Sequence, residues 1–217
     1  MLKRFISVQE GTASQTLIKQ SSFFCHLKMT LTVEEADAFI RQTKRQYTGH
    51  TNCSAYIVGN SGEFQRARDN GEPSGSGGLP ILETLKQYHL SNVTAVVSRK
   101  FGGQLLGIPG LKRAYGGAVN KAILELGLAE WRLQTQISCH IPYHFVNQVD
   151  QAIHETDWIF LENIDYLEQV CLTCFVTHED LDSFLTLLKD LTNGQVEFAQ
   201  GDQRYVPYPL SDSLTSS

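Results

Sequence analysis

The sequence lacks the long apolar segments of a membrane protein. None of its hydrophobic runs approaches the roughly 20 residues that a membrane-spanning helix needs. The first residues, Met1 to Phe5, are not followed by the apolar core of a signal peptide. The five cysteines are odd in number and scattered along the chain, which favours reduced thiols. We therefore expect a cytoplasmic protein with no membrane partner.

The motifs of common nucleotide-binding and acyl-transfer enzymes are also missing. No segment fits the P-loop pattern Gly-x-x-x-x-Gly-Lys-Ser/Thr. The dinucleotide pattern Gly-x-Gly-x-x-Gly, started at Gly75, ends on Pro80. Neither Ser74 nor Ser76 is flanked by both glycines of a serine-hydrolase turn. These absences weigh against both classes of enzyme.

Cysteine and histidine pairs do not form a convincing metal site. Cys171 and Cys174 lie in a predicted strand, where a separation of three places the two thiols on opposite faces. No second cysteine pair completes a zinc set. His140 and His144 would share a face only in a helix, and the strand-like residues around them argue against one. We expect neither a metal nor a cofactor.

Positive charge is scarce in the last part of the chain. Residues 1–134 contain 16 Lys and Arg against 10 Asp and Glu, whereas residues 135–217 contain 2 against 13. This asymmetry predicts a domain boundary and an anionic partner for the first part. The acidic part either keeps the protein soluble or serves as an interaction module for a protein partner.

Glycine, in contrast, is concentrated in two loops, at residues 71–78 and 102–110, and each loop precedes a predicted helix. Glycine lets a ligand or another backbone approach closely. The start of a helix offers unpaired N–H groups and a positive dipole, which favour anions. The loops are therefore candidates for binding phosphate, while tight turns and close packing remain the alternative.

Cations surround these loops. Between residues 66 and 113 the chain has seven Lys or Arg residues and three acids, and phosphate groups of RNA or of a nucleotide would suit such a surface. No RNA-recognition motif with stacking aromatics is visible, so RNA binding would depend on shape and charge. Ordinary surface charge is the alternative. The candidate anion-binding or RNA-binding residues are Arg68, Ser74, Gly75, Ser76, Gly77, Gly78, Arg99, Lys100, Gly102, Gly103, Lys112 and Arg113.

Two acids beside the first loop have two interpretations. Asp69 and Glu72 could act as an acid/base pair or as magnesium ligands in a nucleotide- or phosphate-binding enzyme. We favour a structural role, in which Asp69 bonds the backbone of its own turn and Glu72 pairs with Arg68, Arg99 or Arg113.

Hydrophobic spacing predicts an α+β protein whose two domains join near residues 130–135. A capping box, Thr32-x-x-Glu35, begins the first helix, Pro80 fits the first turn of the second, and Gly127 ends the third. Elements after residue 134 follow the order βαββαβ, which is the ferredoxin-like pattern. The predicted strands are 16–30, 52–59, 63–68, 93–98, 136–141, 157–165, 168–176 and 195–205, and the predicted helices are 32–47, 80–88, 111–126, 145–153 and 181–191.

Three segments between residues 69 and 115 carry a family signature: Asp69-Asn70-Gly71-Glu72-Pro73-Ser74-Gly75, Arg99-x-Phe101-Gly102-Gly103 and Leu111-x-Arg113-Ala114-Tyr115. Their order and spacing resemble the IMPACT/YigZ family, as do Lys19-Gln20-Ser21-Ser22-Phe23 and Asn52-Cys53-Ser54-Ala55-Tyr56. The chain departs from the family pattern at Asn70, where a second acid is usual, and at Lys100, where an aromatic residue is usual. The C-terminal part resembles the small second domain of bacterial members.

The resemblance implies a fold and a function. Residues 1–132 would form the IMPACT N-terminal domain, with the left-handed βαβ arrangement of certain ribosomal proteins and RNase P protein, an exception to the usual crossover rule. Residues 133–206 would form a ferredoxin-like domain similar to the small domains of elongation factor G, and residues 207–217 a disordered tail. Eukaryotic relatives regulate translation, so the resemblance implies a non-enzymatic regulatory factor. From the loops and their cations we expect the first domain to bind structured RNA or ribosome-associated phosphate.

Overall fold

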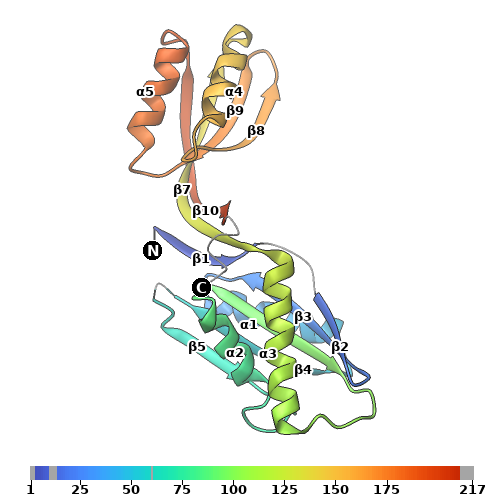
Figure 1. Cartoon of the computed structure of the whole chain (residues 1–217). Helices are drawn as coiled ribbons and strands as arrows, with labels where there is room; N and C mark the ends of the chain where they lie inside the picture. The colour runs from blue at the N-terminus through green and yellow to red at the C-terminus, as the bar shows by residue number, and fades with distance from the viewer. Residues whose placement is uncertain (1–2, 10–13, 60, 211–217) are drawn as a thin grey trace. The chain divides into compact units, whose positions relative to one another are not determined.

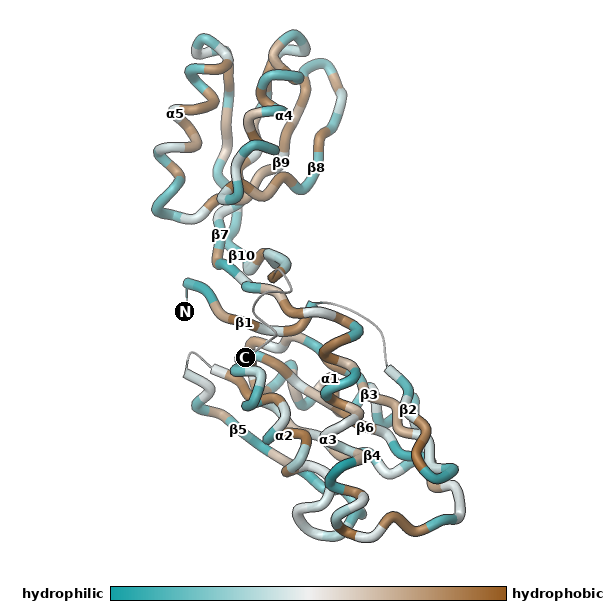
Figure 2. The backbone as a smooth tube through the Cα atoms, in the orientation of Figure 1, coloured by the Kyte–Doolittle hydropathy of each residue, from teal (hydrophilic) through white to brown (hydrophobic). Residues whose placement is uncertain are grey.

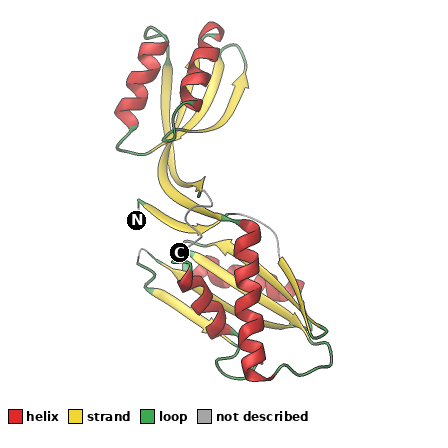
Figure 3. Cartoon of the chain, viewed as in Figure 1, coloured by secondary structure: helices red, strands yellow, loops and turns green. Residues whose placement is uncertain are grey.

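The computed structural model describes residues 3–9, 14–59 and 61–210 and shows a mixed α+β protein with two antiparallel sheets (Figures 1 and 3). The chain divides into two compact units, residues 1–130 with 207–217 and residues 131–206. Strands β7 (Leu128–Ile141) and β10 (Glu197–Pro209) each carry the chain across this division. Part of the expected tail therefore belongs to β10, and residues 211–217 lie outside the described residues.

The first unit contains a sheet with the strand order β2-β3-β6-β4-β5, and each paired neighbour is antiparallel. The apolar, β-branched strand β6 lies at its centre because its side chains are buried on both faces. The elements of this unit are β1 (Arg4–Val8), β2 (Ser14–Ile18), β3 (Ser21–Met29), α1 (Val33–Gln46), β4 (Thr51–Val58), β5 (Phe64–Arg68), α2 (Gly78–Gln87), β6 (Val93–Lys100) and α3 (Gly107–Leu126).

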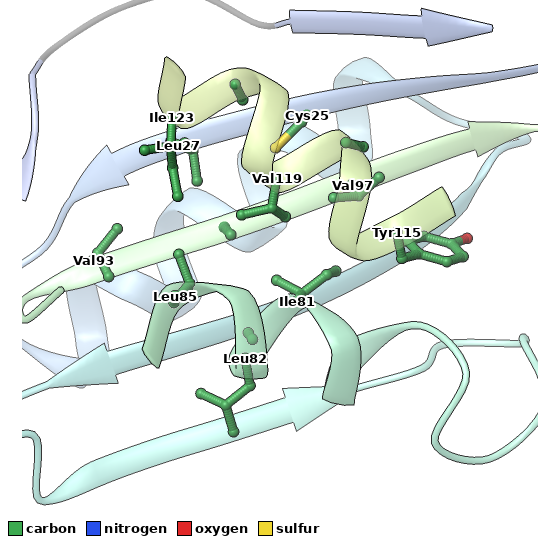
Figure 4. Packing of buried hydrophobic residues seen from close by; sticks show 14 of the residues in the cluster. Cys25, Leu27, Ile81, Leu82, Leu85, Val93, Val97, Tyr115, Val119 and Ile123 are labelled. Carbon is green, nitrogen blue, oxygen red and sulfur yellow. The ribbon is translucent and has the colours of Figure 1, made fainter. Parts of the chain in front are cut away.

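Alternate residues of the central strands face different helices. Val93, Ala95 and Val97 pack in the larger core with α2 and α3 (Figure 4), whereas Val96 packs in a smaller core with Ile40 of α1. Helix α1 thus packs on one face of the sheet, against β4 and β6, and α2 and α3 cover the other face. The alternation of apolar and polar colour along the helices in Figure 2 reflects the same one-sided burial.

The second unit has the predicted element order βαββαβ, formed by β7, α4 (Val146–His154), β8 (Phe160–Tyr166), β9 (Val170–Val176), α5 (Leu181–Leu191) and β10. The sheet that contains its strands has the order β1-β7-β9-β8, and β10 pairs with β7 off this path. Buried residues of α4 and α5 pack in one core with Cys174 of β9. Cys171 is only partly buried, so the two thiols face opposite sides of the strand as predicted.

Several boundaries differ from the predicted ones. The predicted strand 16–30 is two strands joined by a turn at Lys19 and Gln20, which have positive φ angles of 44° and 66°. No glycine, proline or asparagine marks this turn in the sequence. Helix α3 begins at Gly107 instead of Leu111, because Pro109 fits a first helical turn.

The predicted start of α1 is confirmed in part. The hydroxyl of Thr32 accepts the N–H of Glu35 at 3.1 Å, as in a capping box. The carboxylate of Glu35, however, accepts the N–H of Leu31 at 2.8 Å, one residue before the cap.

Among the described residues, no helix is long and apolar enough to cross a membrane.

Two adjacent glycines of α3 provide a stability test. A Cβ at Gly117 would meet no atom within 4 Å, whereas at Gly116 it would lie 3.2 Å from the hydroxyl oxygen of Thr84. We expect Gly117→Ala to raise the free energy of unfolding by about 0.5–1 kcal/mol, because alanine favours the helix. Gly116→Ala should gain less or lose stability. Urea unfolding measures both, and an equal gain would contradict the difference in packing.

Candidate functional site

The first glycine loop is closed by a carboxylate of the chain itself. Oxygen Oδ2 of Asp69 accepts the N–H of Gly75 at 2.8 Å, and Oδ1 accepts the N–H groups of Gly77 and Gly78 at 2.9 Å each. Helix α2 begins at Gly78, and its N-cap residue Gly77 supplies no side-chain cap. Asp69 therefore occupies the position at which an external anion would bind.

This arrangement stabilises the ionised form of Asp69. Partial burial raises the pKa of its carboxyl group, but the three backbone N–H groups together lower the pKa below its usual value. The prediction that Asp69 bonds the backbone of its own turn is confirmed. The amides of Gly75, Gly77 and Gly78, which we expected to bind a ligand, are instead used within the chain.

The glycines of this loop are also required by close packing. A Cβ at Gly77 would lie 2.4 Å from the Cys53 sulfur, and one at Gly78 would lie 2.4 Å from the backbone nitrogen of Arg68. Ser76 is buried, and its hydroxyl donates to the carbonyl of Pro73 at 2.6 Å. Of the expected donors in this loop, only the side chain of Ser74 is exposed.

Cys53, which lies under the loop, is a buried thiol. It donates to the carbonyl oxygen of Asp69 at 2.9 Å. Burial raises its pKa to about 12, so the thiol is protonated at neutral pH. This environment fits core packing and does not produce a reactive thiolate.

A second buried contact joins the first loop to strand β6 and helix α3. Arg99 donates to Oε1 of Glu72 at 2.9 Å, and the hydroxyl of Tyr115 donates to the same oxygen at 2.9 Å. The Arg99 and Glu72 side chains are only 8% and 7% exposed. The guanidinium also lies 5.7 Å from the centre of the Phe23 ring and 5.2 Å from that of Phe101. Arg99, expected to bind an external anion, thus neutralises an internal carboxylate.

Arg68 is also paired within the chain. Arg68, another expected ligand for anions, pairs with Asp37 of α1 at 3.3 Å. From the sequence, Arg99 is one of three arginines expected to pair with Glu72, and the structure selects it. Nothing in the sequence indicates that the hydroxyl of Tyr115 also binds this carboxylate. Burial raises the pKa of the Tyr115 hydroxyl, which keeps it protonated as a donor.

The second loop is closely packed at Gly102, where an added Cβ would lie 1.9 Å from the carbonyl oxygen of Gln20, but it is open at Gly103. The N–H of Gly102 donates to the hydroxyl of Ser21 at 3.3 Å. Gly103 has a φ of +87°, and a Cβ added to it would meet no atom within 4 Å. Helix α3 begins with no side-chain cap at Leu106 and no acid in its first turn. Among the described residues, therefore, no carboxylate is bound at the start of α3, in contrast to α2.

Three cations lie beside the open loop. Lys100 ends β6, and Lys112 and Arg113 lie in the first half of α3. All three are exposed, and none has an ion-pair partner within the described part of the chain. Within the same part of the chain, no three His, Cys, Asp or Glu side chains gather as metal ligands. The chemistry available at the second loop is attraction of negative charge.

The Asp69 contacts predict a pH-dependent stability. Because the pKa of Asp69 is lowered on folding, its contribution is present above the unfolded value of about 3.9 and is lost as pH falls through the folded value. We expect Asp69→Asn to lower the free energy of unfolding by about 1–3 kcal/mol at neutral pH. Chemical unfolding should show this loss shrinking below about pH 4. The control Glu83→Gln, on the exposed side of α2, should change little; a pH-independent loss in Asp69→Asn would contradict the assignment.

The buried pair makes a separate prediction. Glu72→Ala leaves Arg99 charged and unpaired inside the protein, which should cost about 3–5 kcal/mol of unfolding free energy. Tyr115→Phe removes one donor to a charged acceptor and should cost about 1.5–3 kcal/mol. Urea unfolding measures both variants. Losses no larger than that of the exposed control Glu83→Ala would show that the pair contributes nothing.

Comparisons with known proteins agree with the motif residues. Residues 19–123 match the Impact N-terminal domain. The chain is 35% identical over 207 residues to the IMPACT family member YvyE of Bacillus subtilis, covering 95% of each chain. It is 31% identical over 183 residues to the IMPACT family member YigZ of Escherichia coli, covering 83% of this chain and 89% of the relative. A solved structure described as a hypothetical protein is 28% identical and has a TM-score of 0.59, covering 93% of this chain and 99% of the other. The chain belongs to the IMPACT family.

Proposed function

We propose that this IMPACT family protein is a non-enzymatic cytoplasmic factor that regulates translation by binding RNA or ribosome-associated phosphate. The binding surface is the open second loop, with Lys100, Lys112 and Arg113 as the cations and the backbone at Gly103 as a further donor. The exposed, unpaired state of these three cations is the observation that carries the proposal. Phosphate contacts from such side chains give affinity that does not depend on sequence.

The contrast between the two helix starts supports this location. The start of α2 already holds the Asp69 carboxylate, so an added phosphate would have to displace it. The start of α3 has neither an acid nor a side-chain cap. The helix dipole and the nearby cations therefore both attract an approaching phosphate group.

The enzyme alternative has less support because both motif acids are engaged. Asp69 uses both carboxylate oxygens for backbone N–H groups, and Glu72 is buried with Arg99 and Tyr115. A general base needs a free lone pair that can reach the substrate. These contacts favour a structural role for the two acids and a binding role for the protein.

We also propose a fold for each of the two units separately. We propose that the first unit has the ribosomal-protein-like left-handed βαβ fold that the family resemblance implies. The second unit is proposed to be ferredoxin-like, which its element order and the pairing of β7 with both β9 and β10 support. If RNA does not bind, the acidic second unit becomes the candidate surface for a protein partner.

Salt-dependent RNA binding tests the proposed function. We expect the full chain to bind short RNA, with affinity falling steeply between about 50 and 200 mM salt. The double variant Lys112→Ala/Arg113→Ala should bind more weakly and reduce the slope of log affinity against log salt by about 1 for each lost phosphate contact. Fluorescence anisotropy with labelled RNA measures both quantities.

A charge-matched control is available on two other helices. Arg41 of α1 and Lys86 of α2 are exposed and lie outside the second loop. Arg41→Ala/Lys86→Ala makes the same change in net charge and should keep the wild-type salt slope. If both double variants lose affinity equally, binding follows total charge and the proposed surface is wrong.

A further inference from the structure

Within the described residues of the first unit, helix α1 packs against β4 and β6 and leaves the β3 side of its sheet face without a helix over it. Strand β3 alternates between Phe23, Cys25 and Leu27, which are buried against α2 and α3, and residues that point to the other face. On that other face, α1 packs against β4 and β6. Phe24 and His26 consequently remain only half-buried. The β3 side of this face is therefore accessible.

Four rings gather on this face. The ring of Tyr47, at the end of α1, has its centre 5.2 Å from that of Phe24, 4.9 Å from that of His26 and 5.5 Å from that of His50. Phe24 and His50 are 6.0 Å apart. The four residues are half-buried, so the cluster presents part of its ring surface to solvent. We call these residues the aromatic cluster.

The cluster is held in place by a buried amide. The side chain of Asn52 donates to the carbonyl oxygens of Tyr47 at 3.3 Å and His50 at 2.8 Å, which fixes the turn that carries both rings. The hydroxyl of Ser98 in turn donates to Oδ1 of Asn52 at 2.5 Å. A surface fixed in this way loses little conformational entropy when a ligand binds.

The charged side chains that β2, β3 and β6 place on this face are both lysines. Lys100 lies opposite Ser22, next to the Phe24–Ser98 pair on the same face, and Lys28 lies at the far end of the row, opposite Thr94. Both lysines are exposed. The positions of β2, β3 and β6 that share this face carry no carboxylate: Gln15, Leu17, Ser22, Phe24, His26, Lys28, Thr94, Val96, Ser98 and Lys100.

Aromatic rings between cations are suited to single-stranded nucleic acid. Unpaired bases stack on aromatic side chains, while phosphates lie against lysine. In a duplex the base faces are covered by neighbouring base pairs and cannot reach the rings. Burial lowers the pKa of His26, which keeps its ring neutral at pH 7 and compatible with stacking.

We propose that the aromatic cluster is a stacking surface for unpaired bases of single-stranded RNA, with Lys100 connecting it to the second loop. The inference rests on the proposed function and extends it, because it specifies the form of RNA that binds. Lys100 serves both surfaces: it ends β6 next to the second loop, and it shares a sheet face with Phe24. A strand could thus place phosphates at the loop and bases on the rings.

The test uses the full chain with two labelled probes, a short single-stranded RNA and a duplex of the same length. We expect wild type to bind the single strand more tightly. Phe24→Leu and Tyr47→Leu keep an apolar side chain but remove the ring, and each should weaken single-strand binding by about 5- to 100-fold. Their salt slope should equal that of wild type, whereas Lys100→Ala should reduce it by about 1.

Controls separate lost stacking from lost folding. Phe64 is an aromatic residue of β5 that is 58% exposed and lies outside the cluster, so Phe64→Leu should bind as wild type does. Urea unfolding establishes that each variant is folded under the binding conditions. A ring variant that is folded and weakened only for the single strand supports the proposal.

Four results would overturn the proposed stacking surface. Equal binding of the single strand and the duplex would show that the protein does not stack on the faces of unpaired bases. Wild-type affinity in Phe24→Leu and Tyr47→Leu, together with weaker binding in Lys112→Ala/Arg113→Ala, would remove the stacking surface and leave the proposed function standing. A change in oligomeric state of Phe24→Leu without a change in affinity would assign the face to a second copy of the chain. Absence of binding to either probe would reject the proposed function itself.

Discussion

The first unit depends on a carboxylate that the chain supplies to its own helix. Asp69 satisfies two N–H groups at the start of α2 and a third in the loop before it, and all three would otherwise need water, a cap or a ligand. Glu72, three residues later, holds Arg99 and Tyr115 from two other elements. One short loop thus fixes the positions of α2, β6 and α3 through charge, and the glycines around it permit the close approach that these contacts need.

Because of this constraint, several residues of the family signature that resemble a phosphate site make contacts within the chain. Glycine-rich loops, arginines and acids are typical of phosphate sites, and here Asp69, Glu72 and Arg99 are engaged within the chain. Lys100, Lys112 and Arg113 are exposed and lie next to a loop at which no carboxylate of the described residues is bound. A bound carboxylate at one helix start therefore distinguishes two loops of similar composition.

Much of the fold could be predicted because its determinants are local. The β-branched run in β6, the cap at Thr32 and the stop at Gly127 each act within a few residues, and the structure places a strand or a helix boundary at each. The turn at Lys19 and Gln20 could not be predicted, since its left-handed residues are not typical of turns. The choice of Arg99 as partner for Glu72, and the aromatic cluster, depend on strand pairing between distant segments, which no local pattern records.

The two strands that link the units give the second unit the geometry of an inserted module. Within the first unit, the N–H of Leu210 donates to the carbonyl oxygen of Leu128 at 3.1 Å. The chain therefore leaves this unit and returns to it at adjacent points. Residues 131–206 thus interrupt the sequence of the first unit without separating the two backbone segments that flank them.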